Sequence, residues 1–195
     1  MAYNAILKRF MEAAPIPVMA RALIERTLTE DKLNQCFERA VNKQYTRDLL
    51  FDSVFHLMSL VVTCTFSSIN AAYKVNKDNI GVSITSVYNK LNGLEISVSA
   101  ALVRETASDM ATMINQMDAA CQPLLPGYRV KMLDGNCIEA SEHRLEVLRD
   151  QAAGALPGKS LVVYDPALEM AIDVFPCEDG HAQERSLLGQ LMPTV

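Results

Sequence analysis

The chain has no tryptophan, and aromatic residues make up only 6% of its 195 positions. Glycine and proline occur eight times each, which is too seldom for a collagen-like or low-complexity protein. The most apolar stretch, Val54 to Phe66, is interrupted by four polar residues and is too short to cross a bilayer. The first residues lack the apolar core and cleavage site of a signal peptide. We therefore expect no membrane association and no export.

Positive charge is also scarce, since the formal net charge is −5. A protein that binds nucleic acid by electrostatics alone is basic, so the chain as a whole is not of that class. The charges are unevenly spread: residues 1–50 hold eight Lys and Arg against six Asp and Glu, whereas residues 130–195 hold five against eleven. An acidic segment suits divalent-cation chemistry but repels phosphate unless cations are bound.

The cysteine pattern indicates reduced thiols. The odd count of five includes no C-x-x-C pair and no histidine at zinc spacing. Buried, reduced cysteines are typical of cytosolic proteins, so we expect neither disulfides nor a structural zinc site.

Helical periodicity dominates the first part of the chain. Apolar residues at three- and four-residue steps predict helices over residues 18–28, 29–41, 46–73, 83–91 and 94–117, with another over residues 3–13 and a loop at 76–81. Thr29 is a predicted N-cap. His56 lies among apolar neighbours and is expected to pack in the core. The Pro- and Gly-rich segment 122–127 predicts a linker, which places the boundary between two regions near residue 125.

Strand periodicity follows this linker. An apolar run ends at Asp134, and two more runs, Leu161–Tyr164 and Met170–Phe175, flank the turn Asp165-Pro166 and predict a hairpin. A helix is expected after them, over residues 181–192. A carboxylate at the end of a strand is held rigidly where a metal ion or substrate can reach it. Asp134 is therefore the candidate for chemistry, although an aspartate that caps the turn before Gly135 is the structural alternative.

The short sequence motifs around Asp134 resemble those of one protein family. They are Asp134-Gly135, His143-Arg144-Leu145, Leu156–Pro166 and Cys177–Leu188, the last reading CEDGHAQERSLL. Together they are similar to the DDE-type transposases of bacterial insertion sequences, whose catalytic core is ribonuclease-H-like. The resemblance is close over the last third of the chain. Asn136 departs from it, because members often have a small hydroxyl residue there.

The resemblance implies a fold and a catalytic role. The implied fold is α+β: a helical, DNA-binding region over residues 1–125 and the first part of a ribonuclease-H-like core over 126–195, with three strands and a helix. Asp134 is the implied catalytic residue and ligand of Mg²⁺ or Mn²⁺, because the family holds two divalent ions with three carboxylates. The family's second aspartate follows a fourth strand and its glutamate lies farther on, beyond the residues given. We therefore expect the N-terminal portion of a transposase, inactive alone. Asp165, Asp173, Glu178 and Asp179 are not assigned as replacements.

A DNA-binding helix is the second functional expectation. The segment 83–91 follows a helix and a loop at helix-turn-helix spacing, and its polar residues suit phosphate and base-edge contacts. The candidate residues are Ser83, Thr85, Ser86, Tyr88, Asn89 and Lys90. An ordinary polar helix face is the alternative. The resemblance implies double-stranded DNA at transposon ends as the partner, in the bacterial cytoplasm, with a homodimer left open.

Other interpretations compete with these. Glu178, Asp179 and His181 lie close enough to suggest a metal site, but a helix start with Asp179 as N-cap explains them better. His143 is expected on a solvated face. A phosphatase of the haloacid-dehalogenase type needs a second aspartate where Asn136 stands. A non-catalytic DNA-binding or regulatory fragment, and a plain helical protein without such a function, are the remaining alternatives.

Overall fold

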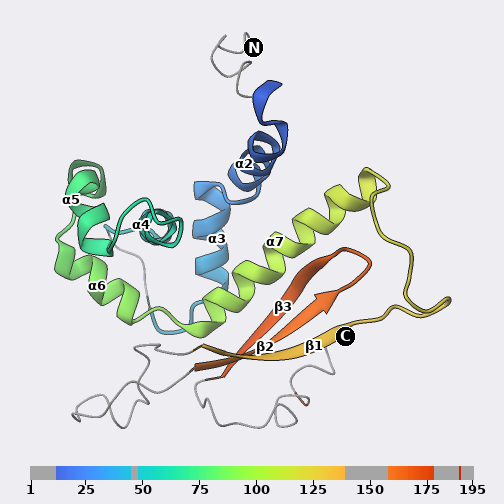
Figure 1. The fold of residues 1–195 in the computed structure, drawn as a ribbon. Helices are drawn as coiled ribbons and strands as arrows, with labels where there is room; N and C mark the ends of the chain where they lie inside the picture. Colours follow the sequence, from blue (N-terminus) through green and yellow to red (C-terminus); the bar gives the residue numbers. More distant parts are fainter. Residues whose placement is uncertain (1–11, 45–47, 139–157, 178–188, 190–195) are drawn as a thin grey trace. The chain divides into compact units, whose positions relative to one another are not determined.

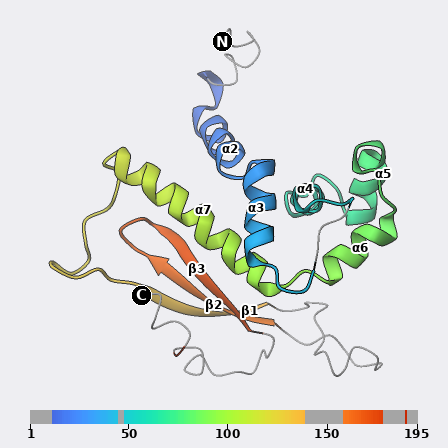
Figure 2. The same ribbon diagram turned by 180° about the vertical axis from the view of Figure 1, so that it is seen from behind.

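The computed structural model describes residues 12–44, 48–138, 158–177 and 189. Its contacts divide the chain into two compact units, Met1–Glu95 and Ile96–Val195. The described residues form six α-helices and one three-stranded antiparallel sheet, so the fold is α+β (Figure 1; Figure 2 gives the reverse view). No strand occurs among the described residues between 18 and 117, as expected. The predicted helices at 3–13 and 181–192 lie largely outside the described residues.

The first described helix begins three residues before the expected start at residue 18, whereas the second begins where the sequence places its start. Helix α2 spans Pro15–Thr27 and carries its prolines in the first turn, where a missing N–H costs nothing. Helix α3 spans Glu30–Ala40. The Thr29 hydroxyl accepts a hydrogen bond from the Lys32 N–H at 3.4 Å, and two acids follow it in the first turn. This confirms Thr29 as an N-cap.

Helices α4 (Phe51–Val62), α5 (Ile69–Ile80) and α6 (Ile84–Asn92) enclose a shared core. Helix α4 packs against both α5 and α6. The buried side chains of this core are Leu49, Val54, Leu57, Ala72, Tyr73 and Val87. The helix expected over residues 46–73 is broken between α4 and α5, at residues 63–68.

The loop predicted at residues 76–81 is wrong, because α5 continues to Ile80. Gly81 ends the helix at φ +69°, a left-handed conformation that glycine adopts without strain, and its N–H donates to the Lys77 carbonyl. Only Gly81, Val82 and Ser83 then separate α5 from α6. The Tyr73 hydroxyl donates to the Val82 carbonyl at 2.7 Å and fixes this turn against the core.

Helix α7 (Ile96–Gln116) lies along strand β3 (Met170–Cys177) in the second unit, as Figures 1 and 2 both show. The Arg104 guanidinium donates to Asp173 at 2.5 Å and lies 5.3 Å from the centre of the Phe175 ring. The division between units therefore falls at residue 95, and the boundary expected near residue 125 lies inside the second unit. The linker there contains a turn with Gly127 at φ +83°.

The sheet is a meander in the order β1-β2-β3, with β1 spanning Met132–Ile138 and β2 spanning Gly158–Asp165. The predicted hairpin is confirmed as the antiparallel pair β2 and β3. The expectation that Asp134 ends its strand is wrong. Asp134 is the third residue of β1 and pairs with Val162, because hydrogen bonding to β2 continues past Gly135 to Ile138.

Asp165, at the end of β2, organises the hairpin turn. Its carboxylate is 1% exposed and accepts hydrogen bonds from Lys131 at 2.5 Å, Arg129 at 3.2 Å and the Ala167 N–H at 3.0 Å. Burial raises the pKa of Asp165, but these hydrogen bonds lower it by more, so the net pKa is below its usual value. The aspartate caps its own turn, as expected of an Asp-Pro sequence.

We predict that Asp165→Asn destabilises the protein by about 3 kcal/mol, because it leaves the largely buried Lys131 side chain without its anion. The free energy of unfolding is measured with urea by circular dichroism. Because the folded pKa is lowered, this stabilisation is present above about pH 3.9 and is lost as the pH falls further. Asp118→Asn removes the same charge at an exposed position and should change stability by less than about 0.5 kcal/mol. Equal effects of the two changes would refute the role of Asp165.

Candidate nucleic-acid interface and the Asp134 strand

The exposed face of α6 is made of uncharged polar side chains. Val87 is fully buried, which turns the opposite side of the helix outward. Thr85, Tyr88 and Asn89 lie on that outer side, and Tyr88 is 40% exposed. Helix α6 contains no acidic residue. These three residues are therefore exposed, as contact with DNA would require.

Two of the six candidates have a structural role at the helix start. The Ser83 hydroxyl accepts a hydrogen bond from the Ser86 N–H at 3.2 Å and so caps α6. The Ser83 and Ser86 hydroxyls also lie 3.0 Å apart, within hydrogen-bonding distance. Both residues are exposed, but their hydroxyls already bind each other.

Lys90 points away from the exposed face of α6. It is only 8% exposed, and its ammonium lies 4.4 Å from the centre of the Phe37 ring of α3. The ammonium has no hydrogen-bond partner in the described structure, and burial lowers the pKa of Lys90. Lys90 does not lie with Thr85 and Asn89, so its inclusion among the DNA-contacting residues is not supported. Position in the sequence could not reveal this, because a long lysine stem packs as readily as it extends.

Sequence reasoning missed Asn92, the last residue of α6. It is exposed and lies seven positions after Thr85, two turns farther along the same side of the helix. The signal was available, since Thr85, Asn89 and Asn92 follow helical spacing.

A loop from α3 holds the C-terminal end of α6. The Gln44 side-chain amide donates to the Lys90 carbonyl at 2.9 Å. The Glu95 carboxylate, just past α6, accepts hydrogen bonds from the N–H groups of Asn42, Lys43 and Gln44. These hydrogen bonds lower the pKa of Glu95 to about 2, and the bond from the Lys43 N–H has the largest effect. Glu95 therefore remains ionised across the physiological range.

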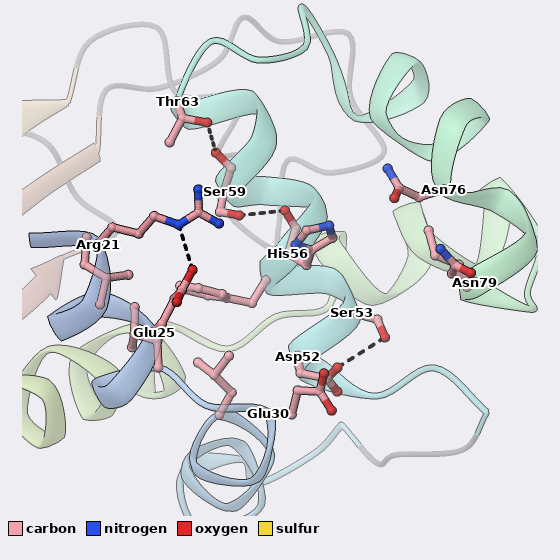
Figure 3. Close-up of a pocket in the computed structure, with 15 residues that line it drawn as sticks. Arg21, Glu25, Glu30, Asp52, Ser53, His56, Ser59, Thr63, Asn76 and Asn79 are labelled. Carbon is pink, nitrogen blue, oxygen red and sulfur yellow. Dashed lines mark hydrogen bonds and ion pairs between the residues drawn. The ribbon is translucent and has the colours of Figure 1, made fainter. Parts of the chain in front are cut away.

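A cleft of about 790 Å³ opens between α2, α3, α4 and α5 (Figure 3). Its wall on α4 includes His56, which is exposed, so the expectation that His56 packs in the core is wrong. Phe51, Val54 and Leu57 take the buried side of α4 instead. Phe55 lines the same cleft as His56, so apolar neighbours in the sequence did not imply burial.

The charges of this cleft do not suit DNA. Arg21 is paired with Glu25 at 2.7 Å, and Glu30 and Asp52 add two further carboxylates to the lining (Figure 3). The Asp52 carboxylate is held by the Asn34 amide at 2.9 Å. Phosphate is repelled by such a lining. The two polar surfaces of this unit therefore differ in charge, with carboxylates in the cleft and none on α6.

Asp134 lies exposed on the side of the sheet opposite α7. Directly paired residues share a face, so Asp134 lies with Val162 and Val174, whereas Val163 and Asp173 lie on the side that contacts Arg104.

The remaining carboxylates of the sheet are engaged. Asp165 binds Lys131 and Arg129, and Asp173 binds Arg104. Among the residues that the structure describes, no three His, Cys, Asp or Glu side chains gather to hold a metal ion. One carboxylate does not fit the donor set that a pair of divalent ions requires. Glu178, Asp179, His143 and His181 lie outside the described residues.

Comparisons with protein-family models, curated proteins and solved structures found no match to this chain. In the described part of the chain, no helix is both long and apolar enough to cross a membrane.

We predict that Lys90→Met stabilises the protein by about 1 kcal/mol near pH 7, because an apolar chain of similar length replaces a buried ammonium without a hydrogen bond. The contact with Phe37 offsets part of the gain. The pKa of Lys90 is lowered in the folded protein. The destabilisation caused by its buried ammonium is therefore present below that pKa and is relieved as the pH rises toward about 10.4. The difference between the two proteins should therefore shrink at alkaline pH.

Thermal unfolding at neutral and alkaline pH measures this difference. Lys74→Met removes the same charge from an exposed position on α5 and should show no such pH dependence. A Lys90→Met protein that is less stable than wild type at neutral pH would mean that the ammonium contributes more through Phe37 than burial costs.

Proposed function

We propose that this chain is part of a DDE-type transposase that acts in DNA transposition. Its helical unit binds double-stranded DNA at insertion-sequence ends, in the bacterial cytoplasm. The observation that carries the proposal is the short connection from α5 to α6, which presents an acid-free helix with exposed hydroxyl and amide groups. A helix held this way after a tight turn is the arrangement with which helix-turn-helix proteins enter the major groove.

The second unit supports the catalytic part of the proposal. The family's ribonuclease-H-like core opens with an aspartate-bearing strand followed by two more strands, and the meander β1-β2-β3 agrees with that opening. Strand β1 forms one edge of the described sheet, next to which a further strand can pair. Asp134 is exposed on this edge strand, which suits a residue that must reach DNA and cations.

The catalytic step belongs to the complete family enzyme, which uses Mg²⁺ or Mn²⁺ to cleave and transfer DNA strands. Among the carboxylates of the three described strands, Asp165 and Asp173 are bound to cationic side chains, which leaves Asp134 for that role. Ions bound by one carboxylate would be held almost entirely by water. The chain by itself is therefore proposed to bind DNA without cleaving it.

A non-catalytic DNA-binding or regulatory fragment is the second candidate, and the lone Asp134 favours it. Such a protein keeps end recognition and lacks chemistry. The genomic reading frame downstream distinguishes the two. Continuation into another strand ending in aspartate favours a split or frameshifted transposase, whereas unrelated sequence favours the regulatory fragment.

We predict that neither the wild-type chain nor Asp134→Ala nicks supercoiled DNA in Mg²⁺ or Mn²⁺, and that both bind duplex DNA equally. The physical reason is that Asp134 serves cations and lies in a different unit from α6. Gel analysis of plasmid topology measures cleavage, and fluorescence anisotropy measures binding.

Metal-dependent nicking that the alanine change abolishes would contradict inactivity. It would direct attention to Asp165, Asp173 and Asp179 as further ligands. Loss of duplex binding in Asp134→Ala would instead contradict the separation of binding from chemistry.

A further inference from the structure

We propose that α6 reads DNA sequence through a row formed by Thr85, Asn89 and Asn92, with Asn89 selecting adenine, while Lys74 and Lys77 of α5 hold the phosphate backbone. This inference rests on the proposed DNA-binding function. It adds which residues determine specificity, which supply affinity and which base is preferred.

The row follows from the rotation of α6 about its axis. Val87 is fully buried and Leu91 packs against the same core, which fixes the inward side of the helix. Thr85, Asn89 and Asn92 are exposed and follow one another at four- and three-residue steps, so they lie along one side of the helix.

The chemistry of this row suits base edges better than phosphates. Its groups are one hydroxyl and two carboxamides, which both donate and accept hydrogen bonds. An asparagine carboxamide can bind adenine at N6 and N7 together, and a threonine methyl can contact the thymine methyl. Of the two asparagines, Asn89 lies at the middle of the row, where a helix in the groove comes closest to the bases.

The helix that carries the row is held at both ends. Ser83 caps its first turn, and the Tyr73 hydroxyl fixes the preceding turn through the Val82 carbonyl. Gln44 binds the Lys90 carbonyl at the other end. A reading side chain on a fixed helix loses little freedom on binding, which is the condition for specific contacts.

Positive charge lies on the preceding helix. Lys74 and Lys77 are exposed on α5, three residues apart and therefore on neighbouring positions of its surface. In helix-turn-helix proteins the first helix crosses the DNA backbone. Lys90 has no part in this, because its ammonium is packed on Phe37.

The experiment selects duplexes from a random-sequence DNA pool with the full chain, then measures binding of the selected duplex and of a scrambled duplex over a range of salt concentrations. We expect Asn89→Ala to lose the preference for adenine at one or two positions. Its affinity for the selected duplex should fall about tenfold, and its affinity for the scrambled duplex should not change.

The phosphate contacts give a different signature. Lys74→Gln and Lys77→Gln should each weaken binding of both duplexes and lower the slope of log affinity against log salt by about one. Asn79→Ala is the matched control for Asn89→Ala, because Asn79 is an exposed asparagine of α5 that lines the acidic cleft. It should change neither preference nor slope.

The outcomes separate this inference from the function on which it rests. Binding of no duplex at low salt overturns the proposed function itself. If the wild type, Asn89→Ala and Thr85→Ala all select the same sequence, the row does not determine the sequence preference. The proposed DNA binding would still hold. If Asn79→Ala alters the sequence preference, recognition takes place at the cleft, and the proposed role of the row is wrong. Asn89→Ser, with circular dichroism of every variant, keeps the test valid if the alanine variant unfolds.

Discussion

The packing of α4 against α5 and α6 determines what the first unit can present to a partner. Val54 and Leu57 of α4 and Val87 of α6 are completely buried in one small core. Because Val87 must face inward, the rotation of α6 is fixed, and its hydroxyl and amide groups face outward. Because Val54 and Leu57 of α4 face this core, His56 lies exposed on another side of that helix. A change of a core residue would therefore alter the exposed surface of α6 without touching it.

The carboxylates of this chain divide by what surrounds them. Asp165 and Asp173 are buried against cationic side chains, and Glu95 is held by three backbone N–H groups. Each stabilises a turn, a helix contact or a loop. Asp134 is exposed on the side of the sheet opposite α7. Burial and partners thus distinguish these structural acids from Asp134, a distinction that residue type alone does not make.

Electrostatics also separate the two polar surfaces of the first unit. The cleft between α2, α3, α4 and α5 carries more carboxylates than cations, whereas α6 has no carboxylate and follows α5, on which Lys74, Lys77 and Asp78 are exposed. A chain with a net charge of −5 can therefore offer DNA a local surface that does not repel it. Overall charge excluded a simple electrostatic binder but not a recognition helix.

The sequence by itself determined the features that depend on neighbouring residues: the helix start at Thr29, the Asp165 turn and the β2–β3 hairpin. Each is set by local hydrogen bonds or by spacing along one element. Only the tertiary structure decided that Lys90 packs inward, that Asp134 lies within β1, and that α7 belongs with the sheet. These depend on contacts between segments far apart in the chain, such as Lys90 with Phe37 or Arg104 with Asp173. Periodicity shows which side of a helix is apolar, but not which distant element will cover it.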